Sequence, residues 1–236
     1  MPETRDRLII ALDVNSAHQA QRIVQSVGAS ASTFKVGKQL FTAEGPQIVR
    51  DLVSSGKKVF LDLKFHDIPN TVSSAVRQAC ELRVSMLTVH ASGGSKMLKA
   101  AAEAADNATL VLAVTVLTSL GDGDLSEIGI AGNVQAQVLR LGALARANGI
   151  RGLVASAHEA RELRRELGED FAIVTPGVRP AGAEKGDQAR VVTPADALRA
   201  GASHIVVGRP ITEADDPAVA AREILAELEG AMQITN

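Results

Sequence analysis

The stretch Lys58–Lys64 has the sequence KVFLDLK, and its pattern indicates the fold class of the whole chain. A short and nearly continuous apolar run of this kind is typical of a strand that is buried on both faces of a parallel sheet. Similar runs recur at steady intervals along the sequence: Leu8–Val14, Thr33–Gly37, Met86–Ala91, Thr109–Leu117, Gly152–Ala157, Phe171–Gly177 and His204–Gly208. With Lys58–Lys64 these runs predict eight parallel strands.

Segments rich in Ala, Glu and Arg separate the apolar runs, and their amphipathic pattern predicts helices. They span Ala17–Val27, Pro46–Ser55, Thr71–Leu82, Met97–Ala105, Gln135–Ala147, Ala160–Leu167, Pro194–Ala200 and Pro217–Glu229. Eight strand–helix units in 236 residues predict an α/β chain that folds as a single-domain (β/α)8 TIM barrel. The alternative is an open doubly wound sheet, which would usually carry a glycine-rich fingerprint after its first strand. Here the first strand ends in Asp13–Ser16, without GxGxxG or GxxxxGK[ST].

Two of the connections between the expected strands and helices are long and rich in glycine and polar residues. They span about residues 118–133 and 178–192. Long loops in compact domains are often active-site lids. Because both loops follow strands, we expect both lids at the C-terminal face of the barrel, where barrel enzymes carry their catalytic residues.

The composition argues against several classes of partner. The net charge is -2, whereas duplex-binding proteins usually have a strong basic excess. The chain has no Tyr or Trp, on which single-stranded nucleic acids commonly stack. The apolar runs are too short for a membrane helix or a signal peptide, and Cys80 is the only cysteine. We therefore expect a cytoplasmic protein that binds neither nucleic acids nor membranes.

Charged residues occur in three consecutive expected strands. Asp13 ends the first strand, Lys35 lies inside the second, and Asp62 and Lys64 end the third, with Asp67 shortly after. Because residues two apart on a strand point to the same side, Asp62 and Lys64 are predicted to face the barrel mouth together. The cluster could be a structural ion-pair network, but four charges that meet at the catalytic end of a barrel favour a catalytic site.

A second group of residues predicts an anion site. Arg179 and Gln188 follow the seventh expected strand, and Gly208 and Arg209 end the eighth. Barrel enzymes often bind phosphate with the loops after these two strands, and arginine forks match phosphate oxygens. From spacing alone, Arg209 could equally be a solvated surface residue. Thr118 offers a hydroxyl at the end of the fifth strand, where it could equally be a strand-end cap.

The histidines give weaker signals. His90 ends the fourth expected strand, and we expect it to support the site through hydrogen bonds rather than to act as a base. His66, between Lys64 and Asp67, could be structural. His18, His158 and His204 show no metal-ligand spacing with Cys or carboxylates. The sequence therefore indicates neither a metal nor a redox cofactor.

The ten-residue stretch Asp62–Thr71, DLKFHDIPNT, resembles the signature of the bacterial orotidine 5'-phosphate decarboxylases. The DxKxxD pattern inside it is shared by related sugar-phosphate barrels, so the specificity comes from the full string and the later motifs. The likeness continues through LDV (12–14), FKVG (34–37), TVHASGG (88–94), LTS (117–119), TPGVRP (175–180), GDQARVVTP (186–194) and VVGRPIT (206–212).

The resemblance implies decarboxylation of orotidine 5'-monophosphate to UMP without a cofactor, the last step of de novo pyrimidine biosynthesis. Lys64 would donate the proton to C6, and its ammonium would stabilise the developing carbanion. Asp62 would lie near the departing carboxylate. Lys35 would bridge the carboxylates and the ribose hydroxyls, and Asp13 would also contact the ribose.

The resemblance also implies a homodimer, in which Asp67, Ile68 and Thr71 would reach across the interface into the partner's site. Thr118 would contact the pyrimidine edge. The residues that would hold the phosphate are Arg179, Gln188, Gly208 and Arg209.

Two alternatives differ in chemistry from this decarboxylase. One is a metal-assisted sugar-phosphate decarboxylase or aldolase of the same barrel superfamily, and the DIPNT string and the Gln188 region argue against it. The other is a non-catalytic nucleotide-binding barrel, which would not need Lys64 and Asp62 together.

Overall fold

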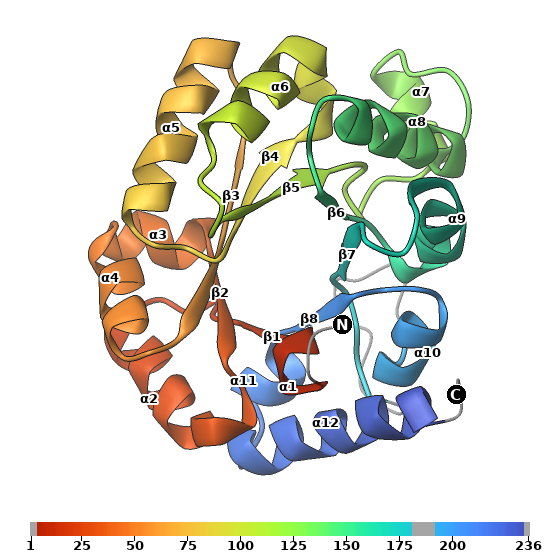
Figure 1. Cartoon of the computed structure of the whole chain (residues 1–236). Coiled ribbons are helices and arrows are strands. Elements are labelled where there is room, and N and C mark those ends of the chain that lie inside the picture. The colour runs from red at the N-terminus through yellow and green to blue at the C-terminus, as the bar shows by residue number, and fades with distance from the viewer. Residues whose placement is uncertain (1–3, 181–191, 234–236) are drawn as a thin grey trace.

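The computed structural model describes residues 4–180 and 192–233, and its strands close into a parallel barrel (Figure 1). The strands are β1 (Leu8–Ala11), β2 (Thr33–Gly37), β3 (Lys58–Phe65), β4 (Met86–His90), β5 (Leu110–Val114), β6 (Gly152–Val154), β7 (Ala172–Thr175) and β8 (His204–Val207). Each strand pairs with its neighbours in sequence, and β8 closes on β1 with Ile9 opposite Val206. The predicted (β/α)8 barrel is therefore confirmed.

Helices surround the strands, and the short α1 (Thr4–Arg7) lies inside this ring, beside β1 and β8 (Figure 1). The other helices are α2 (Ala17–Val27), α3 (Lys38–Glu44), α4 (Gln47–Ser54), α5 (Pro69–Glu81), α6 (Gly94–Ala104), α7 (Asp122–Glu127), α8 (Val134–Ala147), α9 (Ala157–Leu167), α10 (Pro194–Arg199), α11 (Arg209–Thr212) and α12 (Pro217–Gln233). Two short 3-10 segments, η1 (Gly28–Ser30) and η2 (Ala91–Gly93), complete the set. Within the described residues, no helix has the length and apolar character to cross a bilayer.

Every expected helix is present, but four short helices were not predicted: α1, α3, α7 and α11. Each has at most seven residues, which is about two turns and too short for a clear apolar period. One of them, α7, lies within the segment 118–133 that was expected to be a loop throughout. Asp124 stabilises its start, because the Asp124 carboxylate accepts a hydrogen bond of 2.7 Å from the backbone N–H of Gly121.

The apolar residues form two clusters, one on each side of the sheet. The outer and larger cluster packs the sheet against the helices. The inner cluster fills the barrel and consists of Ile9, Ala11, Phe60, Leu112, Val174 and Val206. Because both faces are buried, the strands are apolar along their length instead of alternating. The inner cluster also forms the floor on which the functional cavity lies, since Phe60 and Val206 line that cavity.

Strand β3 departs from regular geometry at its C-terminal end. Leu61 pairs with Leu87 of β4, but the next paired residue is Phe65, which lies opposite Val89. Three residues of β3 therefore lie opposite one residue of β4. Lys64 has φ +54°, a left-handed conformation that is uncommon for a residue other than glycine. Asp62 and Lys64 do converge, but through this bulge rather than through the simple alternation that the sequence suggested.

A buried histidine lies at the opposite, N-terminal end of the barrel. His204 begins β8, and burial lowers its pKa to about 4, with the cation of Arg7 adding to the effect. Its Nδ1 atom is buried and has no hydrogen-bond partner among the described residues. The folded protein therefore holds this ring in its neutral form.

This burial predicts that the protein loses stability in weak acid. The unfolded chain takes up a proton at His204 near its ordinary pKa of 6.5, whereas the folded chain does so only near 4. The contribution of the neutral His204 ring to the free energy of unfolding is therefore fully present above pH 6.5. It decreases as the pH falls from 6.5 to 4, at most by about 1.4 kcal/mol per pH unit. Urea unfolding at several pH values measures the slope.

The variant His204→Gln should lose most of this slope. Burial also lowers the pKa of His90, which contributes in the same direction, so His90→Gln serves as the comparison that retains the contribution of His204. An unchanged slope in His204→Gln would contradict the assignment.

Candidate active site

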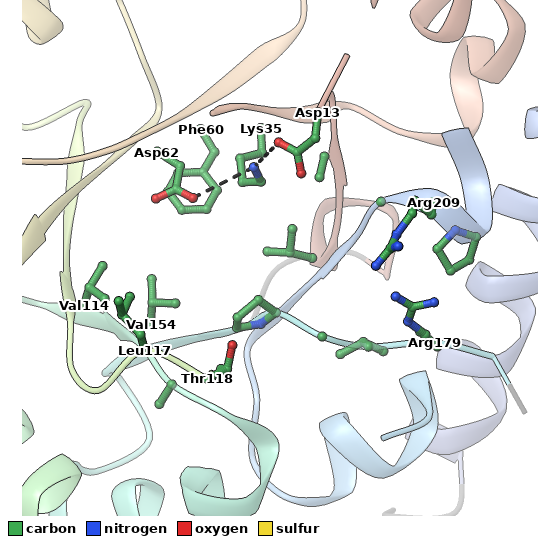
Figure 2. Close-up of a pocket in the computed structure, with 18 of the residues that line it drawn as sticks. Asp13, Lys35, Phe60, Asp62, Val114, Leu117, Thr118, Val154, Arg179 and Arg209 are labelled. Carbon is green, nitrogen blue, oxygen red and sulfur yellow. Dashed lines mark hydrogen bonds and ion pairs between the residues drawn. The ribbon is translucent and has the colours of Figure 1, made fainter. Parts of the chain in front are cut away.

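A cavity of about 440 Å³ opens at the C-terminal ends of the strands (Figure 2). This is the face at which barrel enzymes carry out their chemistry. The residues that line it are Ala11, Asp13, Lys35, Phe60, Asp62, Lys64, Val114, Val116, Leu117, Thr118, Val154, Ala155, Pro176, Gly177, Val178, Arg179, Val206, Gly208, Arg209, Pro210, Thr212 and Glu213. Most of the residues that the sequence singled out are therefore in one place.

Four charged side chains form an alternating row along one side of the cavity. Lys35 Nζ lies 2.8 Å from Asp13 Oδ1 and 3.9 Å from Asp62 Oδ2. Lys64 Nζ donates to both carboxylate oxygens of Asp62, at 2.8 Å each. The exposed fraction of the side chain is 11% for Lys35 and 14% for Asp62. Two cations and two anions therefore alternate in a site that is partly removed from water, where charge interactions are stronger than in bulk solvent.

The charged row leaves little room for a side chain at the end of β2. Gly37 lies opposite Asp62 in the sheet and follows Lys35 by two residues, so it faces the same side. A Cβ atom at position 37 would come within 3.0 Å of both Asp13 Oδ1 and Lys35 Nζ. Gly37 was not predicted as a site residue, although a glycine at the end of a strand that carries a buried lysine is a usable signal.

Strand β4 contributes a residue that the sequence did not single out. Thr88 is buried and lies beside the bulge of β3, where its hydroxyl contacts both Asp62 and the backbone of Lys64. A lone threonine in an apolar strand gives no signal of this kind, because the contact exists only once the strands pair.

The opposite side of the cavity carries two arginines. Figure 2 shows Arg179 and Arg209 on the side of the cavity away from Asp62 and Lys35. Arg179 is buried and follows β7, and its backbone N–H donates to the carbonyl of Val192 at 3.0 Å. Arg209 begins α11 and is exposed, directly after Gly208. Gln188, the remaining predicted phosphate ligand, lies outside the described residues.

A third side of the cavity is largely apolar and includes Thr118. Figure 2 places Thr118 next to Leu117, with Val114 and Val154 on the same side. A flat, apolar ring could pack against the valines while the threonine hydroxyl hydrogen-bonds to a polar edge. The cavity thus offers a charged side, a cationic side and an apolar side with one hydroxyl.

The family model of the orotidine 5'-phosphate decarboxylase / HUMPS family matches residues 6–224. The chain belongs to this family. It is 52% identical over 228 residues to an orotidine 5'-phosphate decarboxylase of Halorhodospira halophila, covering 95% of this chain and 97% of that protein. It is 51% identical to the one from Moorella thermoacetica, covering 95% and 93%.

A solved structure supports the same family and fold. The crystal structure of orotidine 5'-phosphate decarboxylase from Lactobacillus acidophilus superimposes with a TM-score of 0.85 at 38% identity. The match covers 94% of this chain and 99% of the other. The resemblance of the stretch 62–71 to the decarboxylase family therefore extends to the whole barrel.

Three residues that the sequence analysis predicted as site residues do not line the cavity of this chain. Asp67, Ile68 and Thr71 are exposed around the start of α5, and Ile68 is 66% exposed. The Asp67 carboxylate accepts a hydrogen bond of 2.6 Å from the backbone N–H of Ile68. Within one chain these side chains therefore face solvent rather than the cavity.

Two histidines, His66 and His90, lie beside the charged row. The rings of His66 and His90 are 5.3 Å apart between centroids. Burial lowers the pKa of His90, and the neighbouring His66 adds to the effect, so the neutral form of His90 is favoured. Within the described residues, no group of three or more His, Cys, Asp or Glu side chains is placed to hold a metal ion.

Proposed function

We propose that this chain decarboxylates orotidine 5'-monophosphate to UMP, the last step of de novo pyrimidine biosynthesis. The observation that carries the proposal is the alternating row Asp13–Lys35–Asp62–Lys64, which faces two arginines across one cavity. Membership of the family and the relatives named orotidine 5'-phosphate decarboxylase support it.

Lys64 is the proposed proton donor. When CO2 leaves, the electron pair of the broken bond stays on C6 of the pyrimidine, and a proton must be delivered there. The two hydrogen bonds to Asp62 hold the Lys64 ammonium in a fixed position, so no reorganisation is needed when the negative charge develops. The proton then passes from Lys64 Nζ to C6.

Asp62 and Lys35 are proposed to bind the substrate on the charged side of the cavity. The Asp62 carboxylate would lie near the departing carboxylate of the substrate. Lys35 would bridge the carboxylates and the ribose hydroxyls, and its position between Asp13 and Asp62 supports this role. Asp13 is the more exposed of the two carboxylates, with 55% of its side chain accessible, which leaves it open to a ribose hydroxyl.

The cationic side is proposed to bind the phosphate through Arg179, Arg209, Gly208 and Gln188. Phosphate binding far from the reacting carbon can supply energy for closing and organising the site. We propose that the segments 118–133 and 178–192 act as lids over the bound nucleotide. Helix α7, inside the first segment, would move with that lid.

The base is proposed to lie against the apolar side of the cavity, with Thr118 on its edge. The chain has no Tyr or Trp, so other apolar side chains of the cavity, such as Val114 and Val154, would provide the contact surface for the ring. Specificity would then depend on hydrogen bonds and charge, and much of the affinity would come from the phosphate.

We propose further that the chain is a homodimer, in which Asp67, Ile68 and Thr71 complete the partner's site. The exposure of the apolar Ile68 side chain at this face supports the assignment, because an interface would bury it. The cytoplasmic location that the sequence predicts stays a prediction.

The proposal predicts that the purified protein converts orotidine 5'-monophosphate to UMP in the presence of excess chelator. The loss of the substrate's ultraviolet absorbance measures the reaction, and product analysis identifies UMP. Activity that disappears with chelator and returns with a divalent cation would favour a metal-assisted reaction. Binding of UMP without any turnover would instead identify a non-catalytic nucleotide-binding barrel.

A further inference from the structure

The position of Thr88 in the sheet is unusual. Residue 88 is the middle residue of β4 and is the only one between the paired residues Leu87 and Val89. The segment 62–64 lies opposite it, because β3 bulges at this point. Regular pairing of backbone groups is interrupted there, and the Thr88 side chain accepts a hydrogen bond from the Lys64 backbone that the ladder does not provide.

The Thr88 hydroxyl makes two hydrogen bonds of defined direction. It accepts a bond of 2.9 Å from the backbone N–H of Lys64 and donates one of 2.9 Å to Asp62 Oδ1. A hydroxyl has one proton to donate, and an ionised carboxylate can only accept. The direction of both bonds is therefore fixed, and the hydroxyl cannot rotate without losing one of them.

Together these contacts close a ring around the proposed proton donor. The Lys64 backbone is bound to Thr88, Thr88 is bound to Asp62, and Asp62 accepts two bonds from Lys64 Nζ. The same hydroxyl thus holds the left-handed backbone of Lys64 and the orientation of the carboxylate that holds its ammonium. Thr88 itself is fully buried and does not line the cavity.

We propose that Thr88 is a positioning residue, whose hydroxyl sets the geometry of the Asp62–Lys64 pair without touching the substrate. The inference rests on the proposed decarboxylase function. A hydrogen bond that fixes a reacting group affects the transition state more than the bound ground state. Loss of the hydroxyl should therefore lower kcat and leave substrate affinity nearly unchanged.

The test compares Thr88→Val with Thr88→Ser. Valine keeps the branched shape and removes the hydroxyl, whereas serine keeps the hydroxyl. For Thr88→Val we expect kcat to fall about 10- to 100-fold, as for a lost hydrogen bond to a charged group, with KM within about threefold of the parent. Thr88→Ser should retain kcat within about threefold, and calorimetry should show similar UMP affinity for both variants.

Thr109→Val provides the matched control. Thr109 is also buried, and its hydroxyl donates a bond of 2.9 Å to the carbonyl of Val84 before β5, at the opposite end of the barrel. This variant should lose thermal stability while kcat stays unchanged. If Thr88→Val does not fold, Thr88→Ala and Thr88→Ser provide the same comparison between a side chain without a hydroxyl and one with a hydroxyl.

The outcomes separate the two proposals. Absence of decarboxylation in the parent protein would overturn the proposed function and this inference with it. An active parent with an equally active Thr88→Val variant would overturn only the role of Thr88. A fall in stability without a change in kcat, as expected for Thr109→Val, would make Thr88 a purely structural residue and would also overturn it.

Discussion

Replacing Lys64 with alanine is expected to abolish decarboxylation and to leave a folded protein that still binds UMP. The substitution removes both the proton donor and the cation that would face the developing carbanion. General acid catalysis and preorganised charge each contribute factors of about 10² to 10⁴, so a combined loss of 10⁴ or more is expected. Decarboxylation assays, circular dichroism and UMP calorimetry measure the three parts of this result.

Lys99→Ala is the matched control for Lys64→Ala. Lys99 lies on the exposed surface, where it forms an ion pair with Glu103 one turn away. The same change of charge at position 99 should leave turnover and UMP binding unchanged. Near-normal turnover in Lys64→Ala would show that another group delivers the proton.

Mixing inactive Lys64→Ala and Asp67→Ala chains should restore part of the activity. If each site takes Lys64 from one protomer and Asp67 from the other, a hybrid dimer has one site with both residues intact and one site that lacks both. Random assortment makes half of the dimers hybrid, so about a quarter of all sites should be active. Each variant is assayed alone and after subunit exchange with the other.

A mixture of Lys64→Ala and Asp62→Ala chains distinguishes a shared site from a site within one chain. Asp62 and Lys64 are bonded to each other in the same chain, so each site of that hybrid would lack one of the two residues. This mixture should stay inactive. Recovery here, or none with Asp67→Ala after demonstrated exchange, would contradict the proposed interface.

Much of the barrel could be predicted because its signals are local. The run at 58–64 and its repeats follow from burial on both sheet faces, and the helix at Ala17–Val27 agrees with the prediction at both ends. Ser16 is the N-cap of that helix, because its side chain accepts a hydrogen bond of 3.3 Å from the backbone N–H of Gln19. Helix α7 was missed because its six residues carry one buried apolar side chain, Leu125.

The charged row could also be predicted, because charges are rare in buried strands and Asp13, Lys35, Asp62 and Lys64 stand out in the sequence. What could not be predicted depends on contacts between strands. The role of Thr88 appears only when β3 and β4 are paired, because its partners Asp62 and Lys64 are distant from it in the sequence. The bulge likewise has no marker, since position 64 is lysine rather than glycine.

The left-handed backbone at Lys64 limits how this position can evolve. A non-glycine residue in that conformation costs about 1 to 2 kcal/mol, and glycine alone would remove the cost. Glycine has no side-chain amine, so Lys64→Gly would also remove the cation beside Asp62. Selection for stability therefore favours glycine at position 64, whereas selection for activity favours lysine. Higher thermal stability has to come from substitutions elsewhere in the barrel.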